Sequence, residues 1–118
     1  MESHRREMVA ALERYLAKNR LVTVTGSVLS GRRPKNVNGS VPDLEGVTLM
    51  VGQPVFGAAE ECDTYAYVDS RARLDALSKV QNAAVFLVVP AECYVPAKSY
   101  VQRTFPERNI TVLPFGKA

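Results

Sequence analysis

The sequence has few of the residues that build metal sites and disulfide frameworks. It contains one histidine, His4, and two cysteines, Cys62 and Cys93, among 118 residues. A single histidine has no partner for a zinc site, and the two cysteines form neither a CxxC pair nor the dense pattern of a disulfide-stabilised small domain. We therefore expect both thiols to be reduced and structural.

Long apolar runs are also missing. No stretch approaches the roughly 18 consecutive apolar residues of a membrane span. The first ten residues, MESHRREMVA, carry charges where a secretory signal would have its apolar core. The expected compartment is therefore the cytoplasm, without membrane association. The chain is 47% hydrophobic and 23% charged, and it has no repeat or linker. Its length and composition therefore predict that residues 1–118 form a single globular domain.

The net charge of +3 is unevenly distributed. Residues 1–35 contain eight Lys or Arg against three Glu, which gives +5 and leaves −2 for the remainder of the chain. Such a division is typical of a surface that attracts phosphates beside a site that holds cations, although solvated helix faces give similar counts. Nucleic acid is accordingly an expected partner.

Hydrophobic periodicity predicts an α/β domain with a central mixed sheet flanked by helices. A helical stripe of Met8, Leu12 and Leu16 indicates a first helix, and the non-alternating run AAVFLVVP is typical of a central strand buried on both faces. The predicted order is α-β-β-β-α-β-α-β. The expected helices cover 3–18, a segment capped by Asp69 or Ser70, and 95–105, where Pro96 lies near the first turn. The expected strands cover 21–29, 43–51, 55–62, 83–90 and 109–115.

The second and third predicted strands form an acidic hairpin over residues 43–62. Their connection suits a tight two-residue turn that begins at Gly52, with positive φ at this glycine. In that register Glu45 lies opposite Glu60, and Asp43 lies on the same face, because cross-strand partners share a face of the sheet. These three carboxylates would then crowd one patch.

Such crowding needs compensation. Two carboxylates about 4 Å apart repel by about 4 kcal/mol at an effective dielectric near 20. A divalent cation, a proton on one carboxyl or an arginine from the basic loop, residues 30–40, would offset this repulsion. Alternatively, the register shifts by one residue and sends these groups to solvent.

Two short motifs in this order of elements resemble the PD-(D/E)xK nuclease superfamily, which has the restriction-endonuclease-like fold. They are NGSVPDL, residues 38–44, and AAEECDTY, residues 58–65. The resemblance covers most of the chain. It implies a nuclease that hydrolyses phosphodiester bonds with Mg²⁺ or Mn²⁺ and that acts as a homodimer.

The resemblance is incomplete in the second motif. Asp43 matches the metal-binding aspartate of the superfamily. In one alignment Ala58 replaces the other acidic ligand and Glu60 takes the lysine position. In a second alignment Glu60 is the metal ligand, Cys62 takes the lysine position and the carbonyl of Glu61 is a further ligand. Neither alignment supplies the lysine that activates the attacking water.

The candidate catalytic residues are therefore Asp43 and Glu60, with Glu45 and Glu61 as additional metal ligands. Glu45 would replace the missing carboxylate from the neighbouring strand. The ion would activate a bound water and stabilise the charge of the transition state, while Glu60 or a nearby carboxylate accepts the proton.

A basic surface would hold the substrate. Arg32, Arg33 and Lys35 lie just upstream of the acidic hairpin and would contact the phosphate backbone, independently of base sequence. Arg73, on the second helix, occupies the region where the superfamily often has a Gln or Lys that points at the site. The alternative for each is a solvated arginine or lysine.

Three classes of function follow. The first is a small metal-dependent nuclease. The second is a catalytically inactive nuclease-like scaffold that binds nucleic acid or protein, which the Ala58 position and the missing lysine favour. The third is a structural subunit whose basic and acidic halves pair with copies of itself, in which case added salt would weaken association.

Overall fold

The computed structural model of the chain describes residues 3–117 and has an α/β architecture. Its elements follow one another as the sequence predicts, with a short 3-10 helix added before the last helix. None of the helices in this range is long and apolar enough to cross a membrane. The helices are α1 (Ser3–Asn19), α2 (Val68–Ser78), η1 (Ala91–Cys93) and α3 (Tyr94–Thr104), and the strands are β1 (Val22–Ser27), β2 (Leu44–Thr48), β3 (Pro54–Ala59), β4 (Ala84–Pro90) and β5 (Ile110–Phe115).

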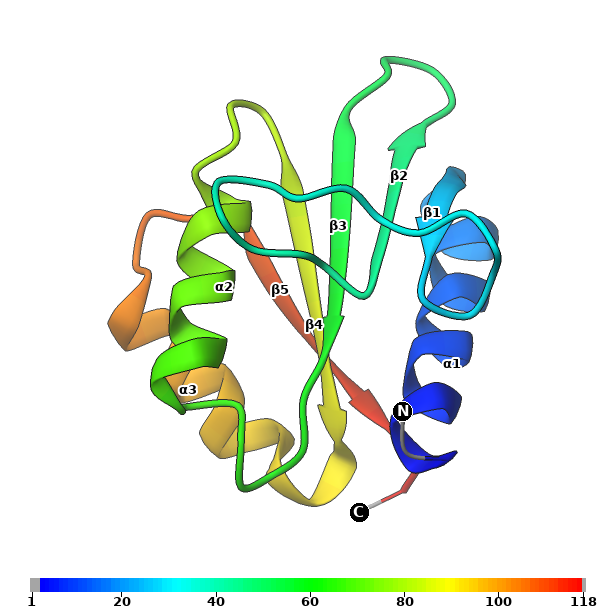
Figure 1. Cartoon of the computed structure of the whole chain (residues 1–118). Helices are drawn as coiled ribbons and strands as arrows, with labels where there is room; N and C mark the ends of the chain where they lie inside the picture. Colours follow the sequence, from blue (N-terminus) through cyan, green and yellow to red (C-terminus); the bar gives the residue numbers. More distant parts are fainter. Residues whose placement is uncertain (1–2, 118) are drawn as a thin grey trace.

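The five strands form one mixed sheet in which their spatial order equals their order in the chain. β1, β2 and β3 pair antiparallel, whereas β3, β4 and β5 run parallel. Figure 1 shows α1 on one face of the sheet and α2 with α3 on the other face. Because β2 and β3 are antiparallel neighbours, the residue that enters β2 lies beside the residues that leave β3.

Each face of the sheet has its own apolar core. The predicted stripe of α1, Met8, Leu12 and Leu16, is buried against one face, together with Phe86 and Val88 of β4. The alternate residues of β4 pack on the opposite face beneath α2 and α3. β4 is thus buried on both faces, as predicted, although the middle strand of the sheet is β3.

The register of the acidic hairpin differs from the prediction. Gly52 has a positive φ of 68°, as expected, but the connection is the longer loop of residues 49–53. Glu45 pairs with Phe56 instead of Glu60. Four residues along a strand span about 13 Å, so the predicted opposition of Glu45 and Glu60 is wrong.

The starts of the two later helices were predicted with different success. α2 begins at Val68, with Tyr67 in the capping position, so neither Asp69 nor Ser70 caps this helix. In α3, Pro96 is the third residue. A backbone N–H in the first turn has no acceptor within the helix, so proline loses no helical hydrogen bond there. The prediction for Pro96 is therefore confirmed.

Candidate functional site

Asp43 lies where the long loop after β1 enters β2, and its backbone is bonded on both sides. Its N–H donates to the carbonyl of Gly57 at 2.9 Å, and its own carbonyl accepts from the N–H of Val28 at 2.9 Å. Asp43 is 4% exposed, and its Oδ2 accepts the N–H of Ala59 at 2.8 Å. These bonds fix the carboxylate at the end of the sheet where β2 begins and β3 ends.

Glu60 directly follows β3 and is 7% exposed. Its N–H donates to the carbonyl of Val88 at 3.0 Å, which continues the parallel pairing of β3 with β4 by one residue. Its Oε1 accepts a hydrogen bond of 2.8 Å from the hydroxyl of Thr64 in the following turn. Glu60 is thus held through its backbone on the strand side and through its carboxylate on the turn side.

Arg73 of α2 joins the two carboxylates. Its Nη2 lies 2.7 Å from Oε2 of Glu60, and its Nη1 lies 3.4 Å from Oδ2 of Asp43. The predicted convergence of Asp43 and Glu60 from adjacent strands is therefore observed, but onto a guanidinium. The sequence predicts a nucleic-acid contact for Arg73, whereas its side chain is only 13% exposed and faces these acids.

Arg5 of α1 approaches Asp43 from the other face of the sheet. Its Nη2 donates to Oδ1 at 3.2 Å and to Oδ2 at 3.1 Å, and its side chain is 33% exposed. The Nε of Arg5 is buried and has no hydrogen-bond partner among the described residues. Helices from both faces of the sheet thus contribute a cation to the same position.

We call Arg5, Asp43, Glu60 and Arg73 the four-residue ion cluster. Its two guanidinium groups and two carboxylates sum to zero formal charge. Buried charges of this kind are tolerated only when they are paired and hydrogen-bonded, because removal from water costs several kcal/mol per ion. The compensation that the crowded acids require is therefore supplied by arginines. They come from α1 and α2, and not from the basic loop.

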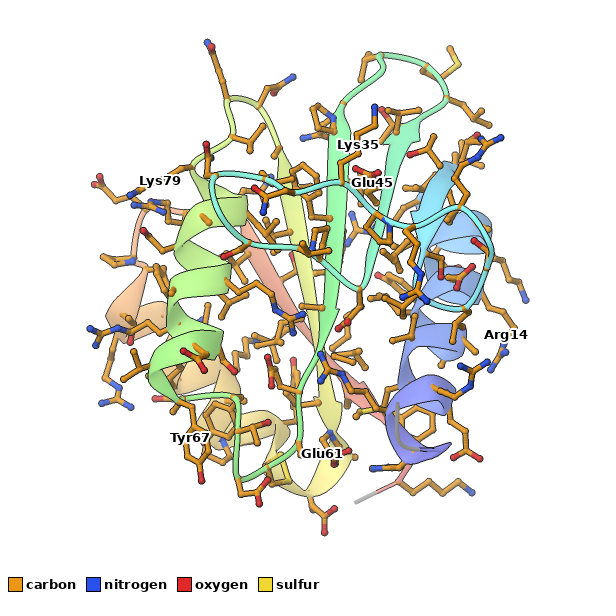
Figure 2. The ribbon with its side chains drawn as sticks, in the orientation of Figure 1. Arg14, Lys35, Glu45, Glu61, Tyr67 and Lys79 are labelled. Carbon is orange, nitrogen blue, oxygen red and sulfur yellow. A yellow bond between two sulfur atoms is a disulfide. The ribbon has the colours of Figure 1, made fainter. Side chains whose placement is uncertain are left out.

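Glu45 does not join this cluster. Its Oε1 accepts the N–H of Lys35 at 3.1 Å, so it anchors the long loop. Figure 2 shows Glu45 beside Lys35 near one end of the sheet and Glu61 near the opposite end. Glu45 is thus placed apart from the acids that it was expected to assist.

Glu61 is also engaged elsewhere. Its carboxylate oxygens lie 3.0 and 3.1 Å from Nδ1 of His4 in α1. Its carbonyl accepts the N–H groups of Thr64 and Tyr65, both at 3.2 Å. The carbonyl that one alignment offers to a metal ion therefore closes a turn.

The ion cluster does not fit a divalent metal ion in this arrangement. Each carboxylate oxygen of Asp43 and Glu60 already accepts a hydrogen bond, and the guanidinium groups of the cluster contact three of these four oxygens. A dication beside two fixed positive charges would be repelled. Residues 3–117 contain no group of three or more His, Cys, Asp or Glu side chains arranged to hold a metal.

The basic loop remains exposed. Arg32, Arg33 and Lys35 all have exposed side chains, and the loop is tied down by Asn38, whose Nδ2 donates to the carbonyl of Ala76 in α2 at 3.1 Å. Figure 1 shows this loop crossing from β1 toward α2 before it returns to β2. It therefore presents three cations on a segment that leads directly into the ion cluster.

The sequence predicts that both cysteines are reduced, and this prediction is wrong. Cys62 and Cys93 form a disulfide. Their spacing of 31 residues is uninformative in the sequence. β3 and β4 are parallel neighbours, however, and each cysteine lies three residues past its strand: Cys62 after Ala59 and Cys93 after Pro90. Parallel pairing is thus the physical reason why the two sulfur atoms meet.

Sequence reasoning missed two members of the site. Arg5 continues the buried stripe of α1, three residues before Met8 and seven before Leu12. A cation in line with an apolar stripe signals a buried partner, although it does not identify the partner. Thr64, which bonds Glu60, has no comparable signal because threonine is common in turns.

Comparison of the chain with models of protein families, with curated proteins and with solved structures gave no match.

Proposed function

We propose that the chain is a restriction-endonuclease-like domain that binds nucleic acid without metal-dependent hydrolysis. The order of elements, the aspartate at the entry to β2 and the acid after β3 support the fold. They are the features in which the chain resembles the PD-(D/E)xK superfamily. The missing lysine and the alanine at position 58 favour a scaffold that has no hydrolytic activity.

The contact of Arg73 with both Asp43 and Glu60 carries this proposal. A guanidinium at that point neutralises the acids that a hydrolytic metal ion would need as ligands. The positive charge also cannot be removed by a change of protonation, because arginine stays protonated at any physiological pH. The cluster then serves to fix α2 and the basic loop relative to the sheet.

The exposed cations Arg32, Arg33 and Lys35 are the proposed contacts to the phosphate backbone. They lie on one loop and have exposed side chains, so they can approach a phosphate without unfolding of the domain. Contacts of this kind contribute a salt-dependent, sequence-independent affinity through the release of counterions.

Fluorescence anisotropy with labelled duplex DNA, single-stranded DNA and RNA tests this proposal. A triple variant, Arg32→Ala, Arg33→Ala and Lys35→Ala, should bind weakly and flatten the slope of log K against log salt by about two to three units on duplex DNA. The matched control removes three exposed cations elsewhere, Arg71, Lys98 and Arg103. If both triple variants lost the same affinity, the loss would reflect only the lower net charge. That result would contradict the proposed binding surface.

The second candidate is a metal-dependent nuclease in which Arg73 leaves the acids when a metal ion binds. The convergence of Asp43 and Glu60 on one point favours it, since two carboxylates from adjacent strands are what a Mg²⁺ site requires. Titration calorimetry with Mn²⁺ separates the candidates, together with cleavage assays on plasmid, single-stranded DNA and RNA. A saturable site and cleavage that both disappear in Asp43→Asn would replace our first proposal with the second.

A further inference from the structure

The Cys62 and Cys93 disulfide lies next to the ion cluster in the chain but has a different environment. Cys62 occupies the turn two residues after Glu60, and Cys93 ends η1 after β4. Their Cα atoms are 5.7 Å apart. Cys62 is exposed, whereas Cys93 is 7% exposed. One half of the bond therefore faces solvent and the other half is anchored in the core beneath α3.

The disulfide lines an open hollow on the surface. Both cysteines contribute to its wall, together with His4, Glu61, Asp63 and Glu92. Thiol–disulfide exchange requires that a thiolate reach one sulfur atom from outside the protein. A bond at the wall of an open hollow satisfies this requirement, whereas a bond enclosed in the core would not.

We propose that Cys62 and Cys93 form a thiol–disulfide exchange site for a dithiol partner whose reacting surface is uncharged or basic. One thiolate of the partner attacks Cys62 Sγ, forms a mixed disulfide and releases the Cys93 thiolate, which takes up a proton. The second partner thiolate then attacks the partner sulfur of the mixed disulfide and releases the Cys62 thiolate, which also takes up a proton. Two electrons pass to the protein, which gains two thiols, and the partner leaves as a disulfide.

The charge of the hollow selects the reductant. Three carboxylates, Glu61, Asp63 and Glu92, line it against the single imidazole of His4. An attacking thiolate that carries further negative charge is repelled by this rim, and one that carries a compensating ammonium is not. The selectivity should weaken as salt screens the rim.

The surroundings of the disulfide can accommodate the two thiols that reduction releases. Cys93 Sγ lies 3.4 Å from the carbonyl oxygen of Pro90, which can accept the weak hydrogen bond of a thiol. Reduction also removes the disulfide that links the turn of residues 61–67 to η1. The turn keeps the hydrogen bonds of Thr64 to Glu60 and to the N–H of Glu61. Reduction should therefore loosen this turn without unfolding the sheet.

Reduction of the oxidised protein under native conditions tests the exchange site. Free thiols are trapped by alkylation and counted by mass spectrometry after addition of dithiothreitol, cysteamine or glutathione at equal thiolate concentration. We expect reduction by dithiothreitol to be faster than global unfolding and cysteamine to react at least several-fold faster than glutathione. Reduction no faster than unfolding would show that the bond is purely structural and would overturn the proposal.

The double variant Asp63→Asn and Glu92→Gln tests the charge selection, because both side chains are exposed and neither belongs to the ion cluster. The preference for cysteamine over glutathione should shrink in this variant and in high salt. An unchanged preference would instead assign it to the size of glutathione and would contradict selection by charge.

Hydrogen exchange measured by mass spectrometry tests the loosening of the turn. Amides of residues 61–67 should exchange faster in the reduced protein, while those of β1, on the far edge of the sheet, should not change. Equal exchange in both forms would overturn the proposed release of the turn. Neither measurement involves nucleic acid, so these results are independent of the proposed binding function.

Discussion

Arg73 Nη2 lies 2.7 Å from Glu60 Oε2, in a position where both side chains are almost entirely buried. The second nitrogen of the same guanidinium faces Asp43. A planar guanidinium can satisfy two separate carboxylates at once, which an ammonium cannot do with the same geometry. This contact ties α2 to the junction of β2 and β3, so stability and the proposed function depend on the same residue.

Arg73→Ala should destabilise the domain by about 3 to 5 kcal/mol, because it leaves Glu60 buried without a cation. Urea unfolding at neutral pH measures the change. The control is Arg71→Ala, which removes an exposed arginine from the same helix and should change the free energy of unfolding by less than about 0.5 kcal/mol. Adding Glu60→Gln to Arg73→Ala should recover part of the loss, since the uncompensated charge is removed. A cost of Arg73→Ala equal to that of the control would show that the ion cluster does not support the fold.

The order of the elements could be predicted because strong periodic signals fix it. The apolar stripe of α1 is typical of a helix and the apolar run of β4 is typical of a buried strand. The alternation of helices and strands along the chain then predicts a central sheet flanked by helices. The hairpin register could not be predicted in the same way. Leu49, Met50 and Val51 have the composition of a strand but lie in an exposed loop, 64%, 88% and 78% exposed. Their sequence gives no indication that pairing stops at Thr48.

The site could be predicted only where topology determines it. Asp43 and Glu60 meet because an antiparallel pair brings the entry to β2 beside the exit from β3. The resemblance places Arg73 at the site, but the pairing of the two acids with Arg73 and Arg5 could not be predicted, because these arginines come from helices on opposite faces of the sheet. The disulfide was missed for a similar reason, since the proximity of Cys62 to Cys93 depends on the parallel pairing of β3 with β4.

Gly46→Ala should destabilise the domain by about 1 to 3 kcal/mol. A Cβ at position 46 would lie 2.5 Å from the backbone carbonyl oxygen of Thr23 on β1, which cannot move without breaking strand pairing. Thermal or urea unfolding checks this. The matched control is Gly31→Ala in the long loop, where the added Cβ meets nothing within 4 Å. A loss in Gly31→Ala as large as in Gly46→Ala would point to a general effect of glycine replacement in place of a steric one.

Asp75→Asn should have a small effect that depends on pH. The hydrogen bond from Lys79 and, less strongly, that from Arg108 lower the pKa of Asp75 below its ordinary value of 3.8. A carboxylate with a lowered pKa in the folded state stabilises the protein above the unfolded pKa, and this contribution is lost as pH falls through the folded pKa.

Because the Asp75 side chain is 37% exposed, solvent screens the pairs, and the variant should lose less than about 1 kcal/mol at pH 7. The loss should vanish as the pH falls well below 3.8. Urea unfolding of both proteins across this range measures it, with Glu107→Gln as the control for removal of one exposed negative charge. A difference that grows toward low pH would contradict the assignment.

The double variant Cys62→Ala and Cys93→Ala should lose about 3 to 4 kcal/mol of stability relative to the oxidised protein. The bond closes a segment of 31 residues, and a cross-link of this length restricts the unfolded chain by about that amount in the loop-entropy model. Urea unfolding of the oxidised protein, the reduced protein and the variant gives the three values. The reduced protein and the variant should agree to within about 1 kcal/mol, because alanine at both positions removes little buried surface. If the reduced protein were much less stable than the variant, the free thiols themselves would be unfavourable in the fold. Reduction would then denature the domain instead of loosening the turn after Glu60.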